Sequence, residues 1–523
     1  MKSKLSAAVV HALVLLPHGC VALAWSPGVA ARGVIGNARA CSPAACTDRD
    51  AIPQADVTLA AQGVAAALDR SPVLKVPRVP HVRDWAPDTV GNPSQFRGGC
   101  MVDFQTLEED ECVVPLPEQG VFVDDSSIVL ASPLVSVDAA DLHGATGYMR
   151  SGPRETTMFA SEEVKAAIVT CGGLCPGLNT VVKEVVSCLR LQYGVEHVYG
   201  VRNGYMGFYS SDWLPLGLED VETIHRQGGT FLGSSRGGHD TTKICDAIEA
   251  SGVNLIFTIG GDGTMKGSQA IAEEFMRRKR KIVVAHVPKT IDNDIPLIDC
   301  TFGFGTAVQE ATHAIHVARD EAAAYPNGVG LVKLMGRHSG FIAAHATIAA
   351  RGVDVCLVPE VPFELEGPNG LLRYLESTVA RRGYCVAVVA EGAGQELLVN
   401  EGETDASGNE LLSDIGTFLK GKIASHFRAR GKPASIKYCD PSYMVRATPA
   451  TAADNILCLQ LAHDAVHGAF AGYSSFMTGR VNGQGVLIPL SAASGRRNCI
   501  QPGGNFWQQL VFATGQPNWD GSE

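Results

Sequence analysis

The sequence predicts an α/β protein with two doubly wound sheets, each covered by helices on both faces. From Val164 onward, short apolar runs rich in Val and Ile alternate with longer segments of helical type, a pattern typical of parallel sheets. Two turns rich in Gly and Asp, at residues 260–264 and 288–294, follow directly on such runs. Because open α/β sheets bind ligands beyond the carboxyl ends of their strands, we expect both turns to face one crevice.

The first α/β unit is expected to begin at Val164. Its apolar runs have the length of buried strands, and the segments between them are long enough for helices. In chain order we predict a strand over 164–170, a helix from Asn179, a strand over 197–201, a helix over 241–250 and strands over 254–259 and 281–287. The basic run at residues 277–281 falls at the expected end of a helix, where cations complement the helix dipole.

A second α/β unit is expected over residues 328–390. Apolar runs rich in β-branched residues predict its strands, at 328–334, 353–358 and 385–390. Residues 81–164 are instead rich in Pro, Asp and Gly. They predict an N-terminal extension whose later part packs on the α/β body.

The N-terminus has the pattern of a targeting sequence. Lysines precede an apolar stretch that ends in Ala22-Leu23-Ala24, which predicts a signal peptide over residues 1–24 with cleavage after Ala24. Residues 25–80 are expected to be disordered and similar to a transit peptide, since no acidic residue occurs over 25–47. Together these segments resemble the bipartite presequence of algae with complex plastids and predict a plastid location. A secreted or a cytoplasmic protein is the alternative.

Composition limits the class of protein. The chain has 523 residues, 46% hydrophobic and 19% charged, which suffices for two domains and an extension. Its formal net charge of −11 argues against nucleic acid as a partner. Apart from the N-terminus there is no apolar run of membrane length. The 15 cysteines lack paired C-x₂-C spacing, so neither a zinc site nor a disulfide framework is predicted.

The turn Gly260-Gly261-Asp262-Gly263-Thr264 has the chemistry of a phosphate site. Glycines let the backbone approach a phosphate closely, and Asp262 can hold Mg²⁺ directly or through water. Thr264 opens the next helix, whose N-terminus attracts anions. An ordinary strand-to-helix turn with a capping aspartate is the alternative that this turn alone leaves open.

The second turn, Pro288-Lys-Thr-Ile-Asp-Asn-Asp294, adds two carboxylates. Asp292 and Asp294 stand two residues apart on a segment expected to be extended. This spacing suits one carboxylate as the base for a substrate hydroxyl and the other near a metal, as phosphoryl transfer requires. A solvated acidic loop is the alternative.

Five further motifs accompany the two turns. They are Cys171-Gly-Gly-Leu-Cys-Pro-Gly-Leu-Asn179, Gly233-Ser-Ser-Arg-Gly-Gly-His239, Met335-Gly-Arg-His-Ser-Gly-Phe341, Glu391-Gly-Ala-Gly394 and Tyr443-Met-Val-Arg446. From about residue 85 to its C-terminus the chain resembles the 6-phosphofructokinases, and specifically their plant-type, ATP-using branch. The resemblance implies the phosphofructokinase fold, with two Rossmann-like domains and, here, an N-terminal extension.

The resemblance also implies how the chain divides. We expect a nucleotide-binding domain over 165–303 plus 445–485, a sugar-phosphate-binding domain over 304–444 and a C-terminal tail over 486–523. A homo-oligomer is implied as well. Bacterial relatives place an arginine seven residues before Met335 that reaches across a subunit boundary, but here that residue is Gly328. A site shared between subunits, and the bacterial oligomeric state, therefore do not carry over.

The implied reaction is phosphoryl transfer from ATP to the C1 hydroxyl of fructose 6-phosphate in glycolysis, giving fructose 1,6-bisphosphate and ADP. Asp292 is implied as the proton acceptor, with Thr290 at the same hydroxyl. Asp294 would support the metal and charge network, and Arg337 would offset charge on the phosphoryl oxygens. The metal is Mg²⁺, held through Asp262.

The resemblance extends to the residues that bind each substrate. Those implied to bind the nucleotide are Gly173, Arg236, Gly237, Gly261, Asp262, Gly263 and Thr264. Those implied to bind the sugar phosphate are Thr290, Ile291, Asp292, Met335, Gly336, Arg337, Glu391, Lys437, Tyr443, Met444, Val445 and Arg446, with the 6-phosphate held by Tyr443, Arg446 and Lys437.

Gly263 and Lys289 bear on the phosphoryl donor. Pyrophosphate users of the family typically have an aspartate in place of Gly263, which fills the space of an α-phosphate; glycine leaves room for ATP. Lys289 occurs in pyrophosphate users and also in the plant-type ATP branch, so it fits either donor. A pyrophosphate-dependent enzyme and a non-catalytic regulatory subunit of the same fold are the alternatives.

Cys171 and Cys175 stand beside the glycines of the motif at residues 171–179. They suit packing or a redox role.

Overall fold

The computed structural model describes residues 75–97, 122–132, 146–398, 412–493, 495, 497–517 and 519, all within the unit Ser71–Glu523. The predicted signal peptide and nearly all of the predicted transit segment lie outside the described residues. Among the described helices we find none with the length and apolar character that a membrane span requires.

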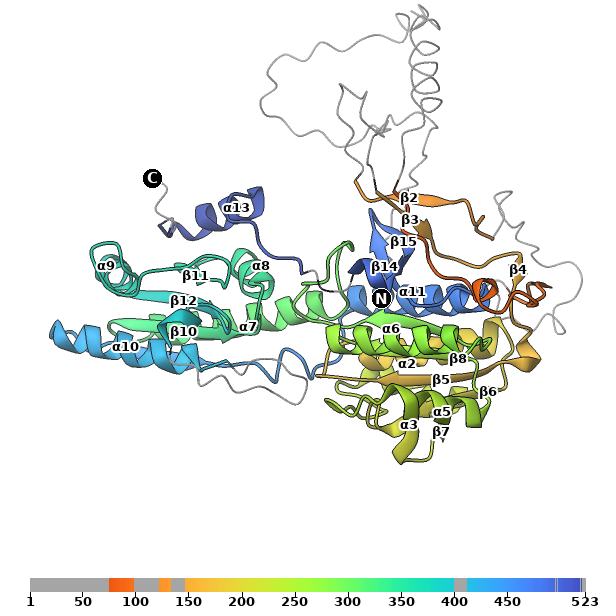
Figure 1. Ribbon diagram of the computed structural model, residues 1–523. Coiled ribbons are helices and arrows are strands. Elements are labelled where there is room, and N and C mark those ends of the chain that lie inside the picture. The colour runs from red at the N-terminus through yellow and green to blue at the C-terminus, as the bar shows by residue number, and fades with distance from the viewer. Residues whose placement is uncertain are drawn as a thin grey trace, which may run out of the picture. The chain divides into compact units, whose positions relative to one another are not determined.

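The larger sheet of the described residues is mixed, with strand order β2-β3-β15-β14-β9-β8-β5-β6-β7 (Figure 1). Its strands are β2 (Ile128–Leu130), β3 (Gly147–Arg150), β15 (Gln484–Pro489), β14 (Phe476–Val481), β9 (Val283–Pro288), β8 (Leu255–Gly260), β5 (Lys165–Thr170), β6 (His197–Val201) and β7 (Leu214–Pro215). The central strands from β14 to β6 run parallel, and the outer ones are antiparallel to their inner neighbours. The strands predicted for the first unit are confirmed, because continuous apolar runs are buried on both faces.

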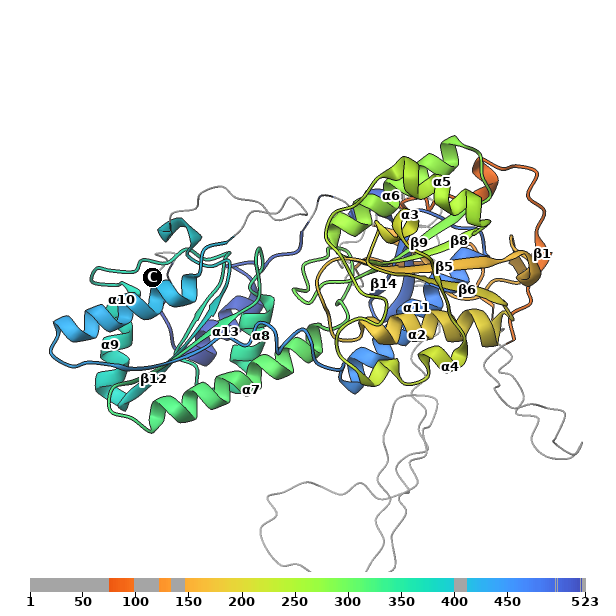
Figure 2. The ribbon, with the colours of Figure 1, turned by 90° about the horizontal axis from the view of Figure 1, so that it is seen from below.

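Helices cover both faces of this sheet, since successive side chains of a strand point to opposite sides. The longer ones are α2 (Leu178–Ser187), α11 (Ala452–Phe470), α5 (Thr241–Ser251) and α6 (Asp262–Arg277). Ala166 and Ile168 of β5 lie in one buried cluster with residues of α2 and α11. Ala167 and Val169 lie in another with residues of α5 and α6. Figure 2 shows these two pairs of helices on opposite sides of β5 and β8.

The smaller sheet is parallel, with strand order β11-β12-β10-β13. Its strands are β11 (Val355–Leu357), β12 (Tyr384–Ala390), β10 (Gly328–Leu334) and β13 (Ser435–Cys439). Its helices are α7 (Phe304–Ala323), α8 (Phe341–Ala350), α9 (Leu371–Arg382) and α10 (Ile415–Ala429), and α13 (Asn505–Thr514) contacts α8. The three strands predicted here are confirmed. β13 was not predicted, because it is half-buried throughout and mixes polar with apolar residues.

Part of the N-terminal extension belongs to the larger sheet. β2 and β3 continue the larger sheet at its edge, and β1 (Asn92–Pro93) pairs with β4 (Thr156–Thr157). Val82 and Trp85 are buried, and the indole Nε1 of Trp85 donates a hydrogen bond to the carbonyl oxygen of Arg280 at 2.7 Å. These contacts fasten the start of the extension to the segment between α6 and β9.

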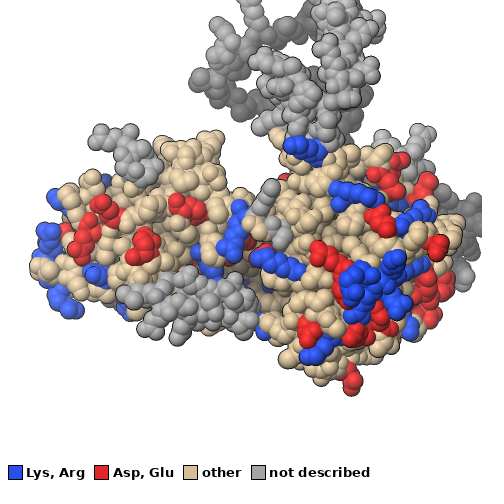
Figure 3. Space-filling model, in the orientation of Figure 1, with Lys and Arg blue, Asp and Glu red and all other residues tan. Residues whose placement is uncertain are grey.

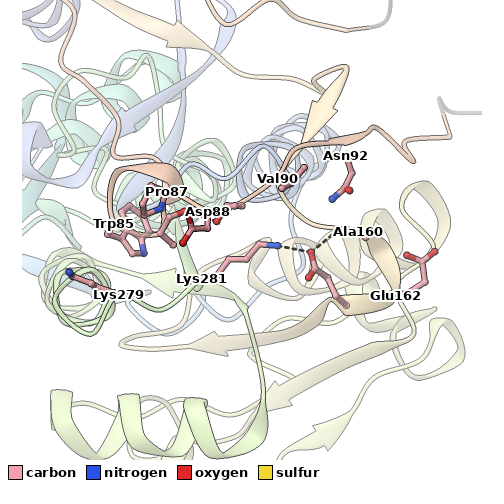
Figure 4. A pocket seen from close by; sticks show the side chains of 12 residues that line it. Trp85, Pro87, Asp88, Val90, Asn92, Ala160, Glu162, Lys279 and Lys281 are labelled. Atoms are coloured by element: carbon pink, nitrogen blue, oxygen red, sulfur yellow. Dashed lines mark hydrogen bonds and ion pairs between the residues drawn. The ribbon is translucent and has the colours of Figure 1, made fainter.

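The basic run lies at the end of α6, as predicted. Arg277 pairs with Glu274 at 2.6 Å, and Lys281 pairs with Glu163 at 2.8 Å. Figure 3 shows Lys and Arg side chains gathered beside acidic ones over this end of the helix. A hollow of about 840 Å³ lies next to it, lined by Trp85 and Lys281 among others (Figure 4). None of the predicted site residues lines this hollow.

One predicted boundary differs from the elements observed. Residue 485 lies inside β15, so the larger sheet continues to Pro489, into the segment predicted as a tail. A β-hairpin is not cut at its turn, because each strand satisfies the backbone of the other. The remaining short elements are α3 (Gly207–Ser210), α4 (Leu218–Val221), α12 (Leu490–Ala493), η2 (Val82–Asp84), η4 (Ser161–Glu163), η5 (Cys188–Gln192), η6 (Ile224–Arg226) and η7 (Gln395–Leu397).

Candidate active site

The two aspartate-bearing turns leave neighbouring parallel strands at the same edge of the larger sheet. Gly260 of β8 pairs with Pro288 of β9, so the residues after them lie side by side. Position 260 requires glycine, since a Cβ there would lie 2.2 Å from Oγ1 of the buried Thr264. The first turn therefore folds tightly over the start of α6, and the sheet brings both turns to one place.

Asp262 is the first residue of α6 and faces solvent. Its side chain is 45% exposed, and its Oδ2 accepts a hydrogen bond from Nζ of Lys266 at 2.8 Å. An exposed ion pair of this kind is weak, so the carboxylate remains available to a cation. Gly261 caps the helix, and a Cβ on Gly263 would meet nothing within 4 Å beyond its own helix backbone. The helix start thus borders open space suited to an anion and its metal.

Lys289 joins the second turn to the loop after β5. Its side chain is buried, and its Nζ donates to the carbonyl oxygen of Gly173 at 2.6 Å. Burial lowers the pKa of Lys289, and the positive charges of Arg236 and Arg446 lower it further. Because the charges of Arg236 and Arg446 both oppose that of Lys289, a bound anion at this place would stabilise the ionised lysine.

The loop that carries Arg236 is tied to the same corner. The backbone N–H of Gly172 donates to the carbonyl oxygen of Ser235 at 3.1 Å, and the hydroxyl of Ser234 donates to the carbonyl oxygen of Gly172. Arg236 and Gly237 are exposed. Two motifs more than 50 residues apart in the sequence therefore meet at residues 171–177, the loop after β5. We call this segment the phosphate loop after the role that the resemblance implies.

The second turn is held by its own hydroxyl group. Oγ1 of Thr290 donates to Oδ1 of Asp294 at 3.1 Å and accepts from the backbone N–H of Asp292, also at 3.1 Å. Asn293 has a φ of 56°, in the left-handed region that Asn adopts more readily than most residues. Ile291 is buried beneath the turn. These bonds fix both aspartates relative to Thr290.

The carboxyl group of Asp292 is balanced between its two protonation states near neutral pH. Its Oδ1 is buried and has no hydrogen-bond partner, although other parts of the residue reach solvent. Burial, then the negative charges of Asp294 and Glu391, raise the pKa of Asp292 to about 7. The guanidinium of Arg337 and a hydrogen bond from its backbone N–H act in the opposite direction. A base with a pKa near the working pH is suited to taking a proton from an alcohol.

Residues located just after two strands of the smaller sheet complete the surroundings of Asp292. Met335, Gly336 and Arg337 follow β10, and Glu391 follows β12, its parallel neighbour. Burial raises the pKa of Glu391, whereas the positive charge of Arg337 lowers it. The positive charge of Arg337 thus acts on two carboxyl groups, one after a strand of each sheet.

The turn after β10 depends on a glycine. Gly336 has a φ of 134°, and a Cβ there would lie 2.5 Å from the carbonyl oxygen of Ser339. The backbone N–H of Gly392 donates to the carbonyl oxygen of Gly336 at 3.1 Å, which joins the loops after β10 and β12. The hydroxyl of Ser339 donates to the carbonyl oxygen of Asp292 at 3.2 Å. The turn thereby contacts the acidic turn directly.

Tyr443 and Arg446 lie at the edge of this group. Tyr443 and Met444 are exposed, whereas Val445 is buried and anchors the segment. The guanidinium of Arg446 lies 5.1 Å from the centroid of the Tyr443 ring, and its Nε is buried without a hydrogen-bond partner. A Cβ on Gly173 would lie 3.8 Å from Nη1 of Arg446, so the guanidinium borders the phosphate loop. A buried, unpartnered N–H costs free energy that an anionic ligand would recover.

Lys437 is not brought into this group. Its Nζ lies 3.4 Å from Oε2 of Glu321 and 3.6 Å from the centroid of the Tyr325 ring. Both partners belong to the C-terminal end of α7 and the residues just after it, because alternation along β13 directs Lys437 to the face that α7 covers. Within one chain, Lys437 therefore does not lie with Tyr443 and Arg446 in a common phosphate-binding site.

Sequence reasoning missed Lys333 and its two carboxylate partners. Nζ of Lys333 lies 2.7 Å from Asp440 and 3.3 Å from Asp414. Lys333 lowers and Asp440 raises the pKa of Glu391, so the cluster borders the site. A lysine inside the apolar run of β10 was the available signal. It does not reveal which carboxylates the fold brings to it.

Cys171 and Cys175 beside the phosphate-loop glycines are buried. Burial raises the pKa of each thiol to about 12. Sγ of Cys175 donates to the carbonyl oxygen of Phe302 at 3.3 Å. Thiols held in the protonated form are poor nucleophiles, so these surroundings favour packing over a redox role.

Known proteins resemble this chain in sequence and in fold. The family model described as Phosphofructokinase matches residues 165–469, more than half of the chain. ATP-dependent 6-phosphofructokinase 1 of Arabidopsis thaliana is 47% identical over 448 residues, which cover 84% of this chain and 91% of that protein. ATP-dependent 6-phosphofructokinase 4, chloroplastic, of the same plant is 46% identical over 446 residues, covering 84% of this chain and 81% of that protein. Among solved structures, the pyrophosphate-dependent phosphofructokinase from Marinobacter aquaeolei has the same fold, with a TM-score of 0.57 at 23% identity, covering 68% of this chain and 93% of that one.

Proposed function

The chain belongs to the phosphofructokinase family, and we propose that it is an ATP-dependent 6-phosphofructokinase. It transfers a phosphoryl group from ATP to the C1 hydroxyl of fructose 6-phosphate, giving fructose 1,6-bisphosphate and ADP. One observation supports this function above all: the carboxyl of Asp292 has its pKa raised to about 7 by burial and neighbouring carboxylates, and the positive charge of Arg337 acts on it. The pair supplies a base for the hydroxyl and a cation for the transferred group.

Asp292 accepts the proton of the C1 hydroxyl. As the proton leaves, a bond forms between the C1 oxygen and the γ-phosphorus, and the bond from that phosphorus to the bridging oxygen breaks to release ADP. Thr290 and Asp294 act as positioning groups, because their hydrogen bonds hold the turn that presents Asp292. Arg337 lies beside the same carboxyl and offsets charge that spreads over the phosphoryl oxygens.

The cations at the phosphate loop bind the charged ends of both substrates. Arg236 and Gly173 suit the phosphates of ATP, since the positive charges of Arg236 and Lys289 act on each other there and Lys289 contacts the carbonyl oxygen of Gly173. Arg446 suits the 6-phosphate, with Tyr443 beside it and Glu391 for the sugar hydroxyls. Arg446→Ala should therefore raise the KM for fructose 6-phosphate about tenfold or more, with a smaller change in the KM for ATP. An unchanged KM for the sugar phosphate would remove Arg446 from the site.

Asp262 is the residue that fits Mg²⁺. It offers an exposed carboxylate next to the open space at Gly263, and Mg²⁺ prefers oxygen ligands and retains several waters. When bound, the ion offsets negative charge on the phosphates of the donor. Asp294, on the neighbouring strand end, adds a second carboxylate to that charge network.

Gly263 supports ATP as the donor. The open space at its missing Cβ leaves room for an α-phosphate, and the relatives at 46–47% identity are named ATP-dependent. The Marinobacter aquaeolei enzyme is named pyrophosphate-dependent, but at 23% identity that likeness concerns the fold alone. Lys289 fits either donor, because its Nζ donates a hydrogen bond to a backbone carbonyl oxygen, that of Gly173.

A direct assay tests the proposal. Purified full-length protein is mixed with fructose 6-phosphate and Mg²⁺, with either ATP or pyrophosphate, and fructose 1,6-bisphosphate is measured. We expect turnover with ATP of roughly 1–100 s⁻¹ and little with pyrophosphate. Robust pyrophosphate activity would favour the pyrophosphate-dependent form. Absence of turnover with both would favour a non-catalytic subunit.

A pair of variants at Gly263 tests the choice of donor. Gly263→Asp should lower kcat/KM for ATP about tenfold or more, because the new carboxylate repels the phosphates. Gly263→Ala is the matched control: its methyl group meets nothing within 4 Å, so ATP turnover should persist. Normal ATP turnover in Gly263→Asp would show that this position does not select the donor.

We also propose that the enzyme serves glycolysis in a plastid and assembles as a homo-oligomer. The chloroplastic name of one relative and the pattern of the N-terminal residues support the location. Residues 1–60 fused to a fluorescent protein should direct it to plastids, and cytosolic or secreted fluorescence would refute the location. Light scattering of the purified protein should give a mass above the 55.2 kDa of one chain.

A further inference from the structure

A compact group of soft donor atoms lies between α2 and α11, and the proposed reaction does not use it. One donor atom each of Cys188, His463 and His467 lies within 4.8 Å of the other two. Cys188 and His467 are buried, and His463 is mostly so, with 21% of its side chain exposed. Thiolate sulfur and imidazole nitrogen are the ligands that Zn²⁺ prefers in proteins.

The spacing of these residues places them on facing sides of two packed helices. His463 and His467 are four residues apart on α11, so they share one face. Cys188 begins the π-helical turn η5 that continues α2, four residues after Glu184. Oε2 of Glu184 lies 3.6 Å from Nε2 of His463. The segment that carries Glu184 and Cys188 therefore lies against the face of α11 that carries the two histidines. π-Helical turns are rare and occur frequently at functional sites.

The bonds around the group leave donor atoms for an ion. The hydroxyl of Tyr193 lies 2.9 Å from Nδ1 of His467, so Nε2 of that ring is the nitrogen available to a metal. Nε2 of His463 is buried without a hydrogen-bond partner. Sγ of Cys188 donates to Oε1 of Gln192 at 3.1 Å; a flip of this amide would let its amino group donate to a thiolate. Metal-bound residues commonly have such supporting hydrogen bonds.

Zn²⁺ binds the thiolate form of a cysteine, so binding releases the proton of the Cys188 thiol to solvent.

We propose that Cys188, His463 and His467 bind one Zn²⁺ ion per chain, with a water molecule in the fourth position. Ligands of one tetrahedral ion, with bonds of about 2.0–2.3 Å, stand roughly 3.3–3.7 Å apart. The donor atoms of the three residues lie within 4.8 Å of one another, so small side-chain rotations bring them to that spacing. The ion joins the helix after the phosphate loop to the helix after Arg446. Its role is structural, since none of these residues belongs to the proposed active site.

Titration with Co²⁺ tests the site without relying on activity. The full-length protein is treated with a chelator, freed of it, and titrated with Co²⁺ while its near-ultraviolet and visible absorption is recorded. We expect a thiolate-to-cobalt charge-transfer band that saturates at one equivalent and is lost on addition of Zn²⁺. Cys188→Ala should abolish the band. Cys245→Ala, which alters a buried cysteine of α5, is the matched control and should retain it.

A second variant guards against loss of folding. His463→Asn alters a partly exposed side chain and should remove the rise in Tm, of a few °C or more, that Zn²⁺ gives the parent protein. Absence of the band in the folded parent protein, or its persistence in Cys188→Ala, would overturn the proposal. Equal loss of the band in both cysteine variants would overturn it as well. A Zn²⁺-dependent rise in Tm that survives in His463→Asn would exclude His463 as a ligand.

Discussion

Asp262 and Asp292 come after neighbouring strands at one edge of the same sheet, yet the two aspartates have opposite surroundings. Asp262 opens α6, is 45% exposed and pairs with Lys266. Asp292 lies in a turn that the loops of the smaller sheet contact, and its Oδ1 is buried without a partner. The first carboxylate is suited to a cation and its water, and the second to a proton. Residue type and strand position alone do not separate these roles, whereas burial does.

The difference arises from the segment that leaves each strand. A helix begins directly after β8, so its first carboxylate points outward beside free backbone N–H groups. After β9 the chain stays irregular, and Thr290 and Ser339 hold Asp292 inward against Arg337. Two aspartates at the same edge of one sheet thus acquire different chemistry from the segments that carry them.

The largest expected effect tests the buried member of the pair. Asp292→Asn should lower kcat by about 10²-fold or more, because it removes the base while keeping size and shape. The variant should remain folded: the folded-state pKa is raised, so the ionised carboxyl costs stability, a cost absent below about pH 4 and complete above about pH 7. Its Tm at pH 8 should therefore equal or exceed that of the parent. A kcat near that of the parent would refute the assignment of the base.

The pH dependence should separate the two aspartates. Only the ionised form of Asp292 accepts a proton, so kcat/KM should fall about tenfold for each pH unit below its pKa of about 7. Asp262→Asn should retain this acid limb, and Asp292→Asn should flatten it. A limb centred near pH 4 would show that burial does not raise the pKa of the catalytic base.

Substitution of the exposed aspartate, Asp262, should weaken Mg²⁺ binding more than it lowers kcat. Asp262→Asn should raise the Mg²⁺ concentration for half-maximal rate about tenfold, as expected for losing roughly 1.4 kcal/mol of binding. Asp320→Asn, which changes an exposed carboxyl on α7, is the control and should leave this concentration unchanged. An unaltered Mg²⁺ requirement in Asp262→Asn would contradict the assignment of the ligand.

The smallest expected effect concerns the ion pair of Asp262. Lys266→Met removes an exposed partner whose contribution is about 0.2–1 kcal/mol, so kcat and the Mg²⁺ requirement should stay within about fivefold of the parent. Measured Mg²⁺ titrations of parent and variant decide the matter. A much larger change would mean that Lys266 itself meets the phosphates.

Burial on both faces made part of the fold predictable. β5, β8, β9 and β10 are continuous apolar runs, and each was predicted within two residues of its ends. β13 and the hairpin of β14 and β15 were missed. β13 is half-buried and polar in part, so its sequence resembles a loop until a neighbour pairs with it.

The candidate site was predictable only in its local parts. The spacing of Asp292 and Asp294 lies within one turn, and the structure retains it. The contact of Lys289 with Gly173 joins residues 116 apart, and no local pattern indicates it. Lys437 illustrates the converse, since its place in the chain suggested a neighbour of Arg446, but the alternation of β13 turns it towards α7. Tertiary geometry decides such cases.

The buried start of the extension sets a limit on proteolytic maturation. Val82 is buried and Trp85 is hydrogen-bonded to the segment before β9. Val79 is buried as well, so the prediction of disorder over residues 25–80 is wrong at its C-terminal end, where the chain already packs on the body. A processing protease that cut after residue 85 would remove side chains from the core and expose apolar surface. If the predicted presequence is removed, we expect the cut to lie upstream of Val79, so that this short segment stays part of the folded body.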